Sequence, residues 1–234
     1  MKAALLFVTA LAALGGCDDI YGLDRGHQGP VAFIQKGASS HAFLPTAQAS
    51  VQLDTPSGPD ALLVLVVTHD AGLEVDGITD NLSNTYIRGI EPTRWATSPF
   101  DTELYYTSGV NGAAPIIVTV TLSGLNASIC DLYLDEYAGA DPISPLDQTS
   151  VSVGIATGTQ VSSGAKMTTE TSELIFGHGE ATGATVSIGE GFFRRQQDNG
   201  NIEEDRNVVV RGSYEATFNL SSPAEWIALM ATFR

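Results

Sequence analysis

Apolar and polar residues alternate along most of the chain, which is the pattern of a β-strand with one face in the core and one in water. The segment 116–123 shows it most clearly, because apolar side chains recur at every second position as Ile116, Val118, Val120 and Leu122. The segment 207–218 alternates in the same way, with Val208, Val210, Tyr214, Ala216 and Phe218 on its apolar side. Almost no segment has the 3.6-residue period of a helix, so the pattern predicts strands.

Two segments are apolar at nearly every position rather than at alternate ones. They are residues 62–67 (LLVLVV) and residues 225–233 (EWIALMATF). A strand covered by other layers on both faces has this composition. These two segments are therefore expected to be central strands.

Further strands are expected between turn-forming residues such as PSGP at 56–59, Asn111-Gly112 and DNGN at 198–201. About a dozen strands at this spacing predict an all-β fold, a two-sheet β-sandwich of the jelly-roll kind. The chain shows no internal repeat and no linker, so residues 30–234 are expected to form a single domain. The further strands are expected at residues 31–36, 49–54, 85–90, 102–107, 129–137, 150–154, 160–163, 173–178 and 186–194.

The first seventeen residues have the order of features found in a secretion signal. A positive charge at Lys2 precedes an uncharged apolar run at residues 3–14, which is too short to span a bilayer as a helix. The run ends at Leu14-Gly15-Gly16-Cys17, which resembles the lipobox of bacterial lipoproteins. The resemblance implies cleavage before Cys17 and acyl chains on that cysteine; the alternative is an ordinary secretion signal that ends near a cysteine.

This resemblance predicts a signal peptide at residues 1–16 and a lipidated tether at residues 17–29. The tether sequence is polar and contains several glycines, so it is expected to lift the domain off a membrane. Two or more acyl chains anchor a protein stably. The predicted location is the cell envelope, on the periplasmic face or the cell surface, with the choice between inner and outer membrane left open.

Charge and cysteine content restrict the partners. The net charge of −16 becomes −17 when Lys2 is removed with the signal peptide. Such an acidic chain is not expected to bind nucleic acid or anionic lipid headgroups, whereas cations and basic partners remain open. Since Cys17 carries lipid, Cys130 has no disulfide partner and is expected to be a small core residue.

Four short segments occur in an order typical of one family. They are TDNLSNTY at 79–86, LYY at 104–106, EYAG at 136–139 and PLDQ at 145–148. Together they resemble an uncharacterised β-sandwich domain of secreted and surface proteins from soil bacteria. The resemblance would cover most of residues 30–234, and it implies fold and compartment without any chemistry.

The strand expected at 129–137 offers one candidate binding surface. Alternation places Cys130, Leu132 and Leu134 on one face and a mixed acidic and aromatic set on the other. Rings that stack on sugar C–H faces, beside carboxylates that accept hydroxyl hydrogen bonds, suit a glycan. The plainer interpretation, which we favour, is an ordinary exposed sheet face. The candidate set is Asp131, Tyr133, Asp135 and Tyr137.

Asp131 and Asp135 do not form a glycosidase pair by themselves. Residues i and i+4 of one strand lie roughly 13 Å apart at a rise of about 3.3 Å per residue. Glycoside hydrolysis uses two carboxyl groups about 5 to 9.5 Å apart. A catalytic pair would need carboxylates from different strands that face one cleft.

The segment 198–205 (DNGNIEED) concentrates oxygen ligands around a turn, as a Ca²⁺ site requires. It lacks the spacing of an EF-hand, and a solvated acidic hairpin is the simpler interpretation. No other cofactor is expected. The candidate ligands are Asp198, Asn199, Asn201, Glu203 and Asp205.

No other motif carries chemistry: the histidines at positions 27, 41, 69 and 178 are scattered, and no nucleophile elbow or phosphate loop is present. The chain is therefore expected to be a cell-envelope lipoprotein with a non-catalytic binding or structural module. Its expected partners are the membrane, through the anchor, and a glycan or surface protein. Whether it is an enzyme stays open; the alternative function is a carbohydrate-active enzyme on the same sandwich.

Overall fold

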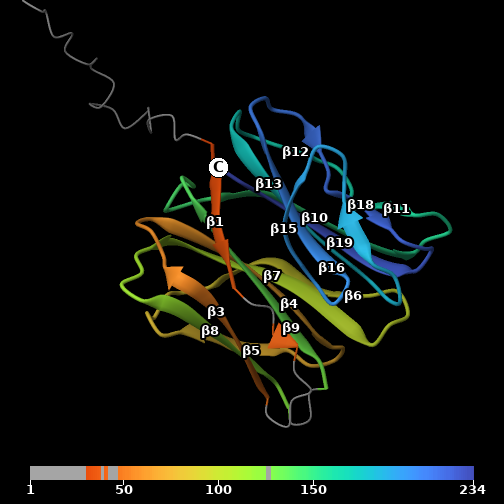
Figure 1. Cartoon of the computed structure of the whole chain (residues 1–234), viewed down its shortest axis with the longest axis horizontal. Helices are drawn as coiled ribbons and strands as arrows, with labels where there is room; N and C mark the ends of the chain where they lie inside the picture. The colour runs from red at the N-terminus through yellow and green to blue at the C-terminus, as the bar shows by residue number, and fades with distance from the viewer. Residues whose placement is uncertain (1–29, 38–39, 42–46, 125–127) are drawn as a thin grey trace, which may run out of the picture.

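The computed structural model describes residues 30–37, 40–41, 47–124 and 128–234, in which all regular structure is β (Figure 1). The prediction of an all-β sandwich is confirmed. Within these ranges, no helix is long and apolar enough to cross a membrane. The predicted signal peptide, Cys17 and the tether lie outside the described residues.

The first half of the chain forms a sandwich of two antiparallel sheets, here called the N-terminal sandwich. Its inner sheet has the order β1-β9-β4-β7-β6, with β2 also paired to β9. Its outer sheet has the order β3-β8-β5. The bounds are Ala32–Lys36 (β1), Ser40–His41 (β2), Gln48–Pro56 (β3), Ala61–Asp70 (β4), Val75–Asp80 (β5), Ile87–Arg94 (β6), Phe100–Val110 (β7), Pro115–Leu122 (β8) and Cys130–Ala138 (β9).

The second half forms the C-terminal sandwich. Its inner sheet has the order β10-β19-β13-β16-β15, its outer sheet the order β11-β18-β14, and β12 pairs with β17 in a separate two-stranded ribbon. The bounds are Leu146–Ile155 (β10), Gln160–Ser162 (β11), Lys166–Met167 (β12), Glu173–Ala181 (β13), Val186–Ile188 (β14), Phe193–Asp198 (β15), Asn201–Val208 (β16), Ser213–Tyr214 (β17), Thr217–Leu220 (β18) and Glu225–Phe233 (β19).

The two sandwiches repeat one topology. If β1, β3–β5 and β6–β9 are matched in chain order with β10, β11, β13, β14, β15, β16, β18 and β19, both inner sheets and both outer sheets have the same strand order. Only β2 and the β12–β17 ribbon fall outside the match. The sequence shows no such repeat, because the matched strands share a place in the fold and not their residues.

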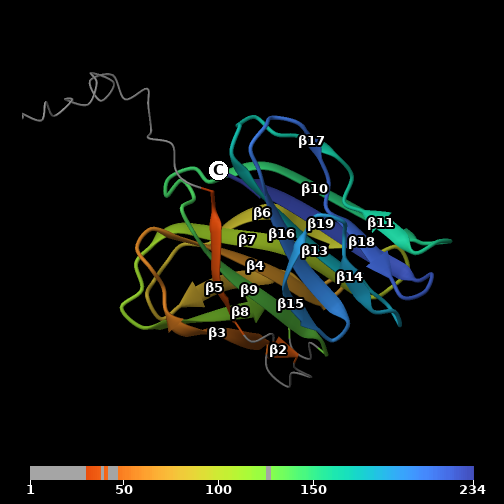
Figure 2. The same ribbon diagram turned by 45° about the horizontal axis from the view of Figure 1, so that its top comes forward.

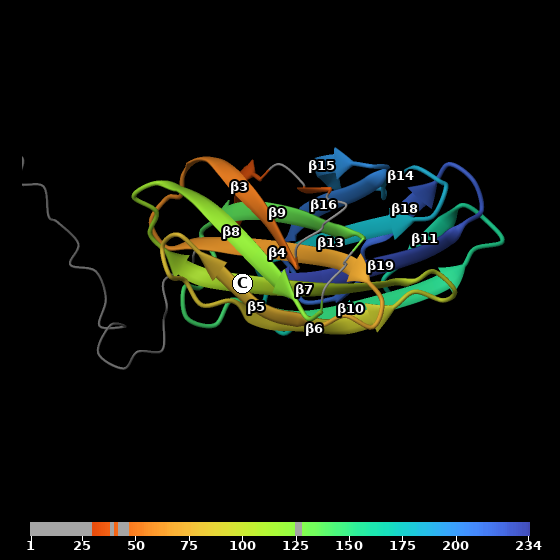
Figure 3. The same cartoon turned by 90° about the horizontal axis from the view of Figure 1, so that it is seen from below.

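The inner sheets of the two sandwiches pack face to face, and this interface is here called the seam (Figure 3). Its apolar part joins side chains such as Val64 and Val66 of β4 to Phe176 of β13 and Leu229 of β19. The opposite face of each inner sheet packs on its own outer sheet and forms a further core. The expected sandwich therefore occurs twice, with four layers of sheet in place of two.

The stacking explains the two segments that are apolar on both faces. In β4, Leu62, Val64 and Val66 face the seam, whereas Leu63, Leu65 and Val67 face the outer sheet. In β19, Ile227 and Leu229 face the seam, whereas Ala228 and Met230 face the other way. The prediction that both are central, doubly covered strands is confirmed.

The prediction of one strand over 207–218 is wrong. The chain leaves the inner sheet after Val208, and Val209 and Val210 are exposed. The hydroxyl of Tyr214 donates to the Val210 carbonyl at 2.7 Å, which closes a turn into the β12–β17 ribbon. Val208 belongs to the core as expected, whereas Val210, which the alternation placed beside it, lies beyond the end of β16 and is exposed.

Gly179 of β13 tests the packing between the inner and outer sheets of the C-terminal sandwich. A Cβ at this position would lie 2.8 Å from the Phe218 ring, a contact that real Cβ atoms do not make. Gly179→Ala should therefore cost about 1–3 kcal/mol of stability through overpacking, which lowers Tm by several degrees for a chain of this size. Differential scanning calorimetry measures the shift.

Gly77→Ala in β5 is the matched control, because a Cβ there meets nothing within 4 Å. It should leave Tm unchanged or raise it slightly. Equal Tm values for the two variants would contradict the packing of Phe218 on β13.

Candidate functional site

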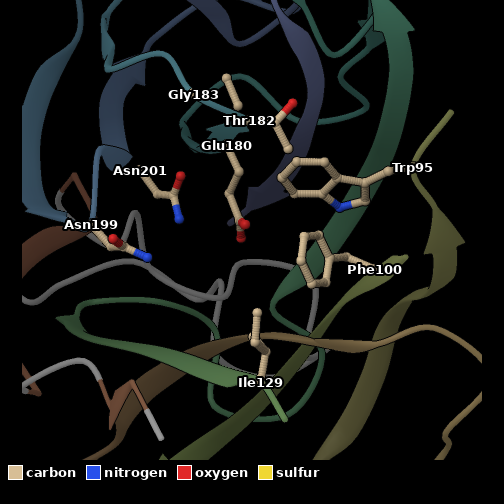
Figure 4. A pocket seen from close by; sticks show the side chains of 9 residues that line it. Trp95, Phe100, Ile129, Glu180, Thr182, Gly183, Asn199 and Asn201 are labelled. Carbon is tan, nitrogen blue, oxygen red and sulfur yellow. The ribbon is translucent and has the colours of Figure 1, made fainter. Parts of the chain in front are cut away.

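A pocket of about 220 Å³ opens at one end of the seam, and it is here called the end pocket (Figure 4). It lies where β7 and β9 begin, where β13 ends, and beside the turn between β15 and β16. Both sandwiches therefore contribute to its wall. The lining residues are Trp95, Phe100, Ile129, Glu180, Ala181, Thr182, Gly183, Asn199 and Asn201.

Two aromatic rings border the end pocket on the side of the N-terminal sandwich. Trp95 and Phe100 pack edge to face, with ring centroids 5.7 Å apart and an interplanar angle of 76°. The indole Nε1 of Trp95 donates to Thr102 Oγ1 at 2.9 Å, which fixes the ring. Figure 4 shows both rings beside the space that the Glu180 carboxylate and the Asn201 amide also face.

Glu180 supplies the carboxylate of the end pocket, and two hydrogen bonds hold it. Its Oε1 accepts from Thr68 Oγ1 at 2.5 Å and lies 2.6 Å from His178 Nε2. Thr68 in turn lies 2.9 Å from the hydroxyl of Thr102. A residue of each sandwich therefore positions this carboxylate, which is almost completely buried.

His178 lies behind Glu180, fully buried in the seam. Burial alone would lower the pKa of this imidazole, but hydrogen bonds and charge interactions with Glu180 and Glu203 outweigh it and raise the pKa to about 9. His178 Nδ1 lies 3.5 Å from Glu203 Oε1. At neutral pH the ring is therefore an imidazolium between two carboxylates.

Asp135 and Glu203 meet across the seam, one from each sandwich. The side-chain amide of Gln196 donates to Asp135 Oδ1 at 3.3 Å and also to Glu203 Oε2. Complete burial and the adjacent Glu203 carboxylate hold the pKa of Asp135 well above its ordinary value. This shift in the pKa favours the neutral form of Asp135, which reduces the negative charge that the seam has to accommodate.

The same face of β16 also carries a charged pair, formed by Arg195 and Asp205. Arg195 donates from Nε and Nη2 to the two oxygens of Asp205, both at 2.6 Å. The guanidinium also stacks over the Phe33 ring at 4.7 Å. We call the buried set His178, Glu180, Glu203, Asp135, Gln196, Arg195 and Asp205 the seam cluster.

The face of β9 that was considered for glycan binding is not exposed. Asp131, Tyr133, Asp135 and Tyr137 are all buried, because they point into the seam and the C-terminal sandwich covers them. Alternation correctly separated them from Cys130, Leu132 and Leu134, which face the outer sheet. The expectation that this set forms a surface is wrong, since a strand between two sheets has no solvent side.

The acidic segment 198–205 is also not a solvated hairpin along its length. Only its turn is exposed: Asp198 ends β15, and Asn199 adopts a positive φ of 49° in the predicted turn. Asn201, Glu203 and Asp205 point into the seam from β16, where they contact Tyr133, Gln196 and Arg195 respectively. Spread along one strand, these oxygens do not converge on a point.

The predicted Ca²⁺ site therefore receives no support from this arrangement. Among the described residues, no group of three or more His, Cys, Asp or Glu side chains is placed to hold a metal ion. Asn199 and Asn201 instead line the end pocket.

Sequence reasoning missed Trp95, Phe100 and Glu180, and it gave His178 no role. None of them belongs to a motif, and they come from three separate strands or loops that meet only when the sandwiches stack. The one available signal was the alternation His178-Gly179-Glu180, which places two ionisable side chains on one face of a strand otherwise read as core.

No family model, no curated protein and no solved structure matches the chain.

The buried ionisable groups predict that stability falls as pH rises from about 5 to 9. His178 has its pKa raised from 6.5 to about 9, and burial raises the pKa of Glu204 from 4.5 to about 8. The folded protein therefore holds protons that the unfolded chain releases in this range, so the stability that they contribute is complete at lower pH and is lost on the way up. Thermal melts at intervals of half a pH unit test this.

Glu204→Gln isolates one of these groups. Glu204 faces the outer sheet, one of its oxygens accepts from the Gly189 amide at 2.8 Å, and the other has no partner among the described residues. The variant should melt several degrees higher than the wild type at pH 8 and show a flatter decline between pH 5 and 8. Glu74→Gln, at an exposed position, should follow the wild-type curve. A Tm that is constant from pH 6 to 9 would exclude these protonation states.

Proposed function

We propose that this chain is a lipid-anchored cell-envelope protein that binds one sugar residue of a glycan in the end pocket, without catalysis. The observation that carries the proposal is the content of that pocket: two aromatic rings, a fixed carboxylate and two amide side chains around one space. Apolar rings suit the C–H faces of a sugar, and carboxylate and amide groups suit its hydroxyls.

The size of the end pocket favours a single small ligand. At about 220 Å³ it is smaller than the roughly 300–1,000 Å³ of pockets for drug-sized molecules. It opens at the end of the seam beside the exposed Thr182, Gly183 and Asn199. The rest of a longer glycan would therefore remain in solvent.

Binding is favoured over hydrolysis because one carboxylate, that of Glu180, lines the end pocket. Glycoside hydrolysis generally uses two carboxyl groups on opposite sides of the bond that breaks. The other carboxyl groups of the seam cluster lie deeper and are held by His178, Gln196 and Arg195. Glu180 then acts as a hydrogen-bond acceptor whose charge His178 stabilises.

A glycan array probed with the chain from Asp18 onward should identify a ligand, and calorimetric titration of that ligand tests the pocket. Glu180→Gln should weaken binding at least ten-fold, since a hydrogen bond to a charged group contributes about 1.5–3 kcal/mol. Asn199→Gly should weaken it about two- to ten-fold, because it removes one neutral partner while glycine keeps the positive φ.

Ser83→Gly is the matched control, because Ser83 also has a positive φ, of 63°, in a turn that does not line the end pocket. It should bind as the wild type does. A ligand whose affinity is the same in all three variants, or an array without any signal, would contradict the proposal.

The anchor has its own test. Cys17→Ala should abolish metabolic labelling with a fatty acid and block cleavage of the signal peptide, because the cysteine sulfur is the proposed acylation site. Cys130→Ala removes the only other cysteine, which is buried in the core and has its pKa raised to about 12. It should label normally. Labelling that survives Cys17→Ala would disprove the lipid anchor.

A further inference from the structure

Exposed aliphatic side chains gather at the end of the molecule opposite the end pocket. Four of them define what is here called the apical surface: Ile143, Met167, Val209 and Val210, with exposed fractions of 79%, 61%, 75% and 63%. They lie in or beside the loop between β9 and β10, the β12–β17 ribbon, and the loop after β16. Isolated exposed aliphatic residues are common, but a group of them marks a contact surface.

Hydrogen bonds and ion pairs connect these loops. Met167 pairs with Ser213 in the ribbon, and the Tyr214 hydroxyl bonds the Val210 carbonyl. On the other side, Glu170 lies between the guanidinium groups of Arg211, at 3.5 Å, and Arg234, at 3.6 Å.

Arg234 also reaches the loop of Ile143. Its Nε donates to the Ser144 carbonyl at 3.0 Å, and its backbone amide donates to the Pro145 carbonyl at 2.9 Å. The four aliphatic residues therefore belong to one continuous end of the fold, which lies at the top of Figures 1 and 2.

Three basic side chains lie at the apical surface although the chain as a whole is acidic. Lys166, Arg211 and Arg234 lie at its rim. Acidic groups are present too, but they are engaged: Glu170 by the two arginines, and Asp147 by the amide and hydroxyl of Thr169. Asp141 accepts from the amides of Ile143 and Ser144 and has further interactions.

The described chain also begins at this end. Asn207 Nδ2, two residues before Val209, donates to the Val31 carbonyl at 2.9 Å. The Asp141 amide donates to the Arg234 carbonyl, and both pictures show the end of the chain beside the beginning of β1 (Figures 1 and 2). The described part of the chain therefore begins beside the apical surface.

We propose that the apical surface docks on the phospholipid bilayer that holds the lipid anchor. The aliphatic side chains enter the headgroup region, and Lys166, Arg211 and Arg234 contact lipid phosphates at the rim. The inference rests on the proposed anchor, which places the membrane on this side of the molecule. The acidic groups elsewhere are screened beyond about 8 Å at physiological ionic strength.

Docking orients the end pocket away from the membrane. Residues 17–29 can extend roughly 45 Å at most, so the anchored domain stays near the bilayer at high effective concentration, and a weak contact is enough to hold it. The end pocket, at the opposite end of the seam, then faces outward toward any ligand.

The test couples the chain from Cys17 onward to a maleimide phospholipid in vesicles, so that it does not depend on acylation in the cell. Cys130 is buried and does not compete. Vesicles of phosphatidylcholine with about 30% phosphatidylglycerol carry bromine on their acyl chains, which quenches a tryptophan that enters the bilayer. Val210→Trp places the probe on the apical surface, and Ile155→Trp, similarly exposed and paired with Glu225 near the end pocket, is the control.

Quenching of the indole introduced by Val210→Trp should exceed that of the Ile155→Trp control at least three-fold. Adding Lys166→Glu and Arg211→Glu to the Val210→Trp chain should at least halve the quenching. Equal quenching of the two probes would overturn the proposal, as would a dimer in light scattering that buries the Val210→Trp probe without bromine quenching. Fatty-acid labelling of Cys17 tests the anchor separately, so failure of one proposal is distinguishable from failure of the other.

Discussion

The structure depends on how charge is compensated inside the seam. Stacking two inner sheets face to face removes the side chains of β9, β13 and β16 from water, and several of these are ionisable. An uncompensated buried charge costs several kcal/mol, so each must be protonated, paired or hydrogen-bonded. The pKa of Asp135 is raised, which favours its neutral form, Asp205 is paired with Arg195, and Glu180 and Glu203 share the His178 imidazolium.

Many of these contacts join one sandwich to the other. Tyr133 of β9 accepts from Asn201 of β16 at 2.9 Å, and Thr68 of β4 donates to Glu180 of β13. Apolar faces can slide over one another at little cost, whereas hydrogen bonds between fixed partners hold at one position only. The seam cluster therefore sets the register of the two sandwiches, and by doing so it assembles the end pocket, whose aromatic rings and carboxylate come from different halves.

The sequence predicted strands well where both faces of a strand are apolar or where one face is in water. The segments 62–67 and 225–233 and the alternation in β8 and β9 all have the expected faces. It failed at β16, where NIEEDRNV contains more charge than any core strand should, and at the polar face of β9. Periodicity shows which side chains share a face; it does not show that a second sheet with complementary charge covers that face. The end pocket was unpredictable for the same reason, since Trp95 and Glu180 are neighbours only across the seam.

The repeated topology makes the chain resemble a dimer whose two subunits are joined by one short connection between β9 and β10. Opening an apolar interface exposes apolar surface to water, which costs free energy. The ionisable groups of this seam, in contrast, regain favourable hydration when the seam opens. Separating the two sandwiches along the seam therefore costs less free energy than separating an apolar interface of the same area. Water can solvate the groups that separation of the two halves would expose, which distinguishes this seam from the interface of a purely apolar dimer.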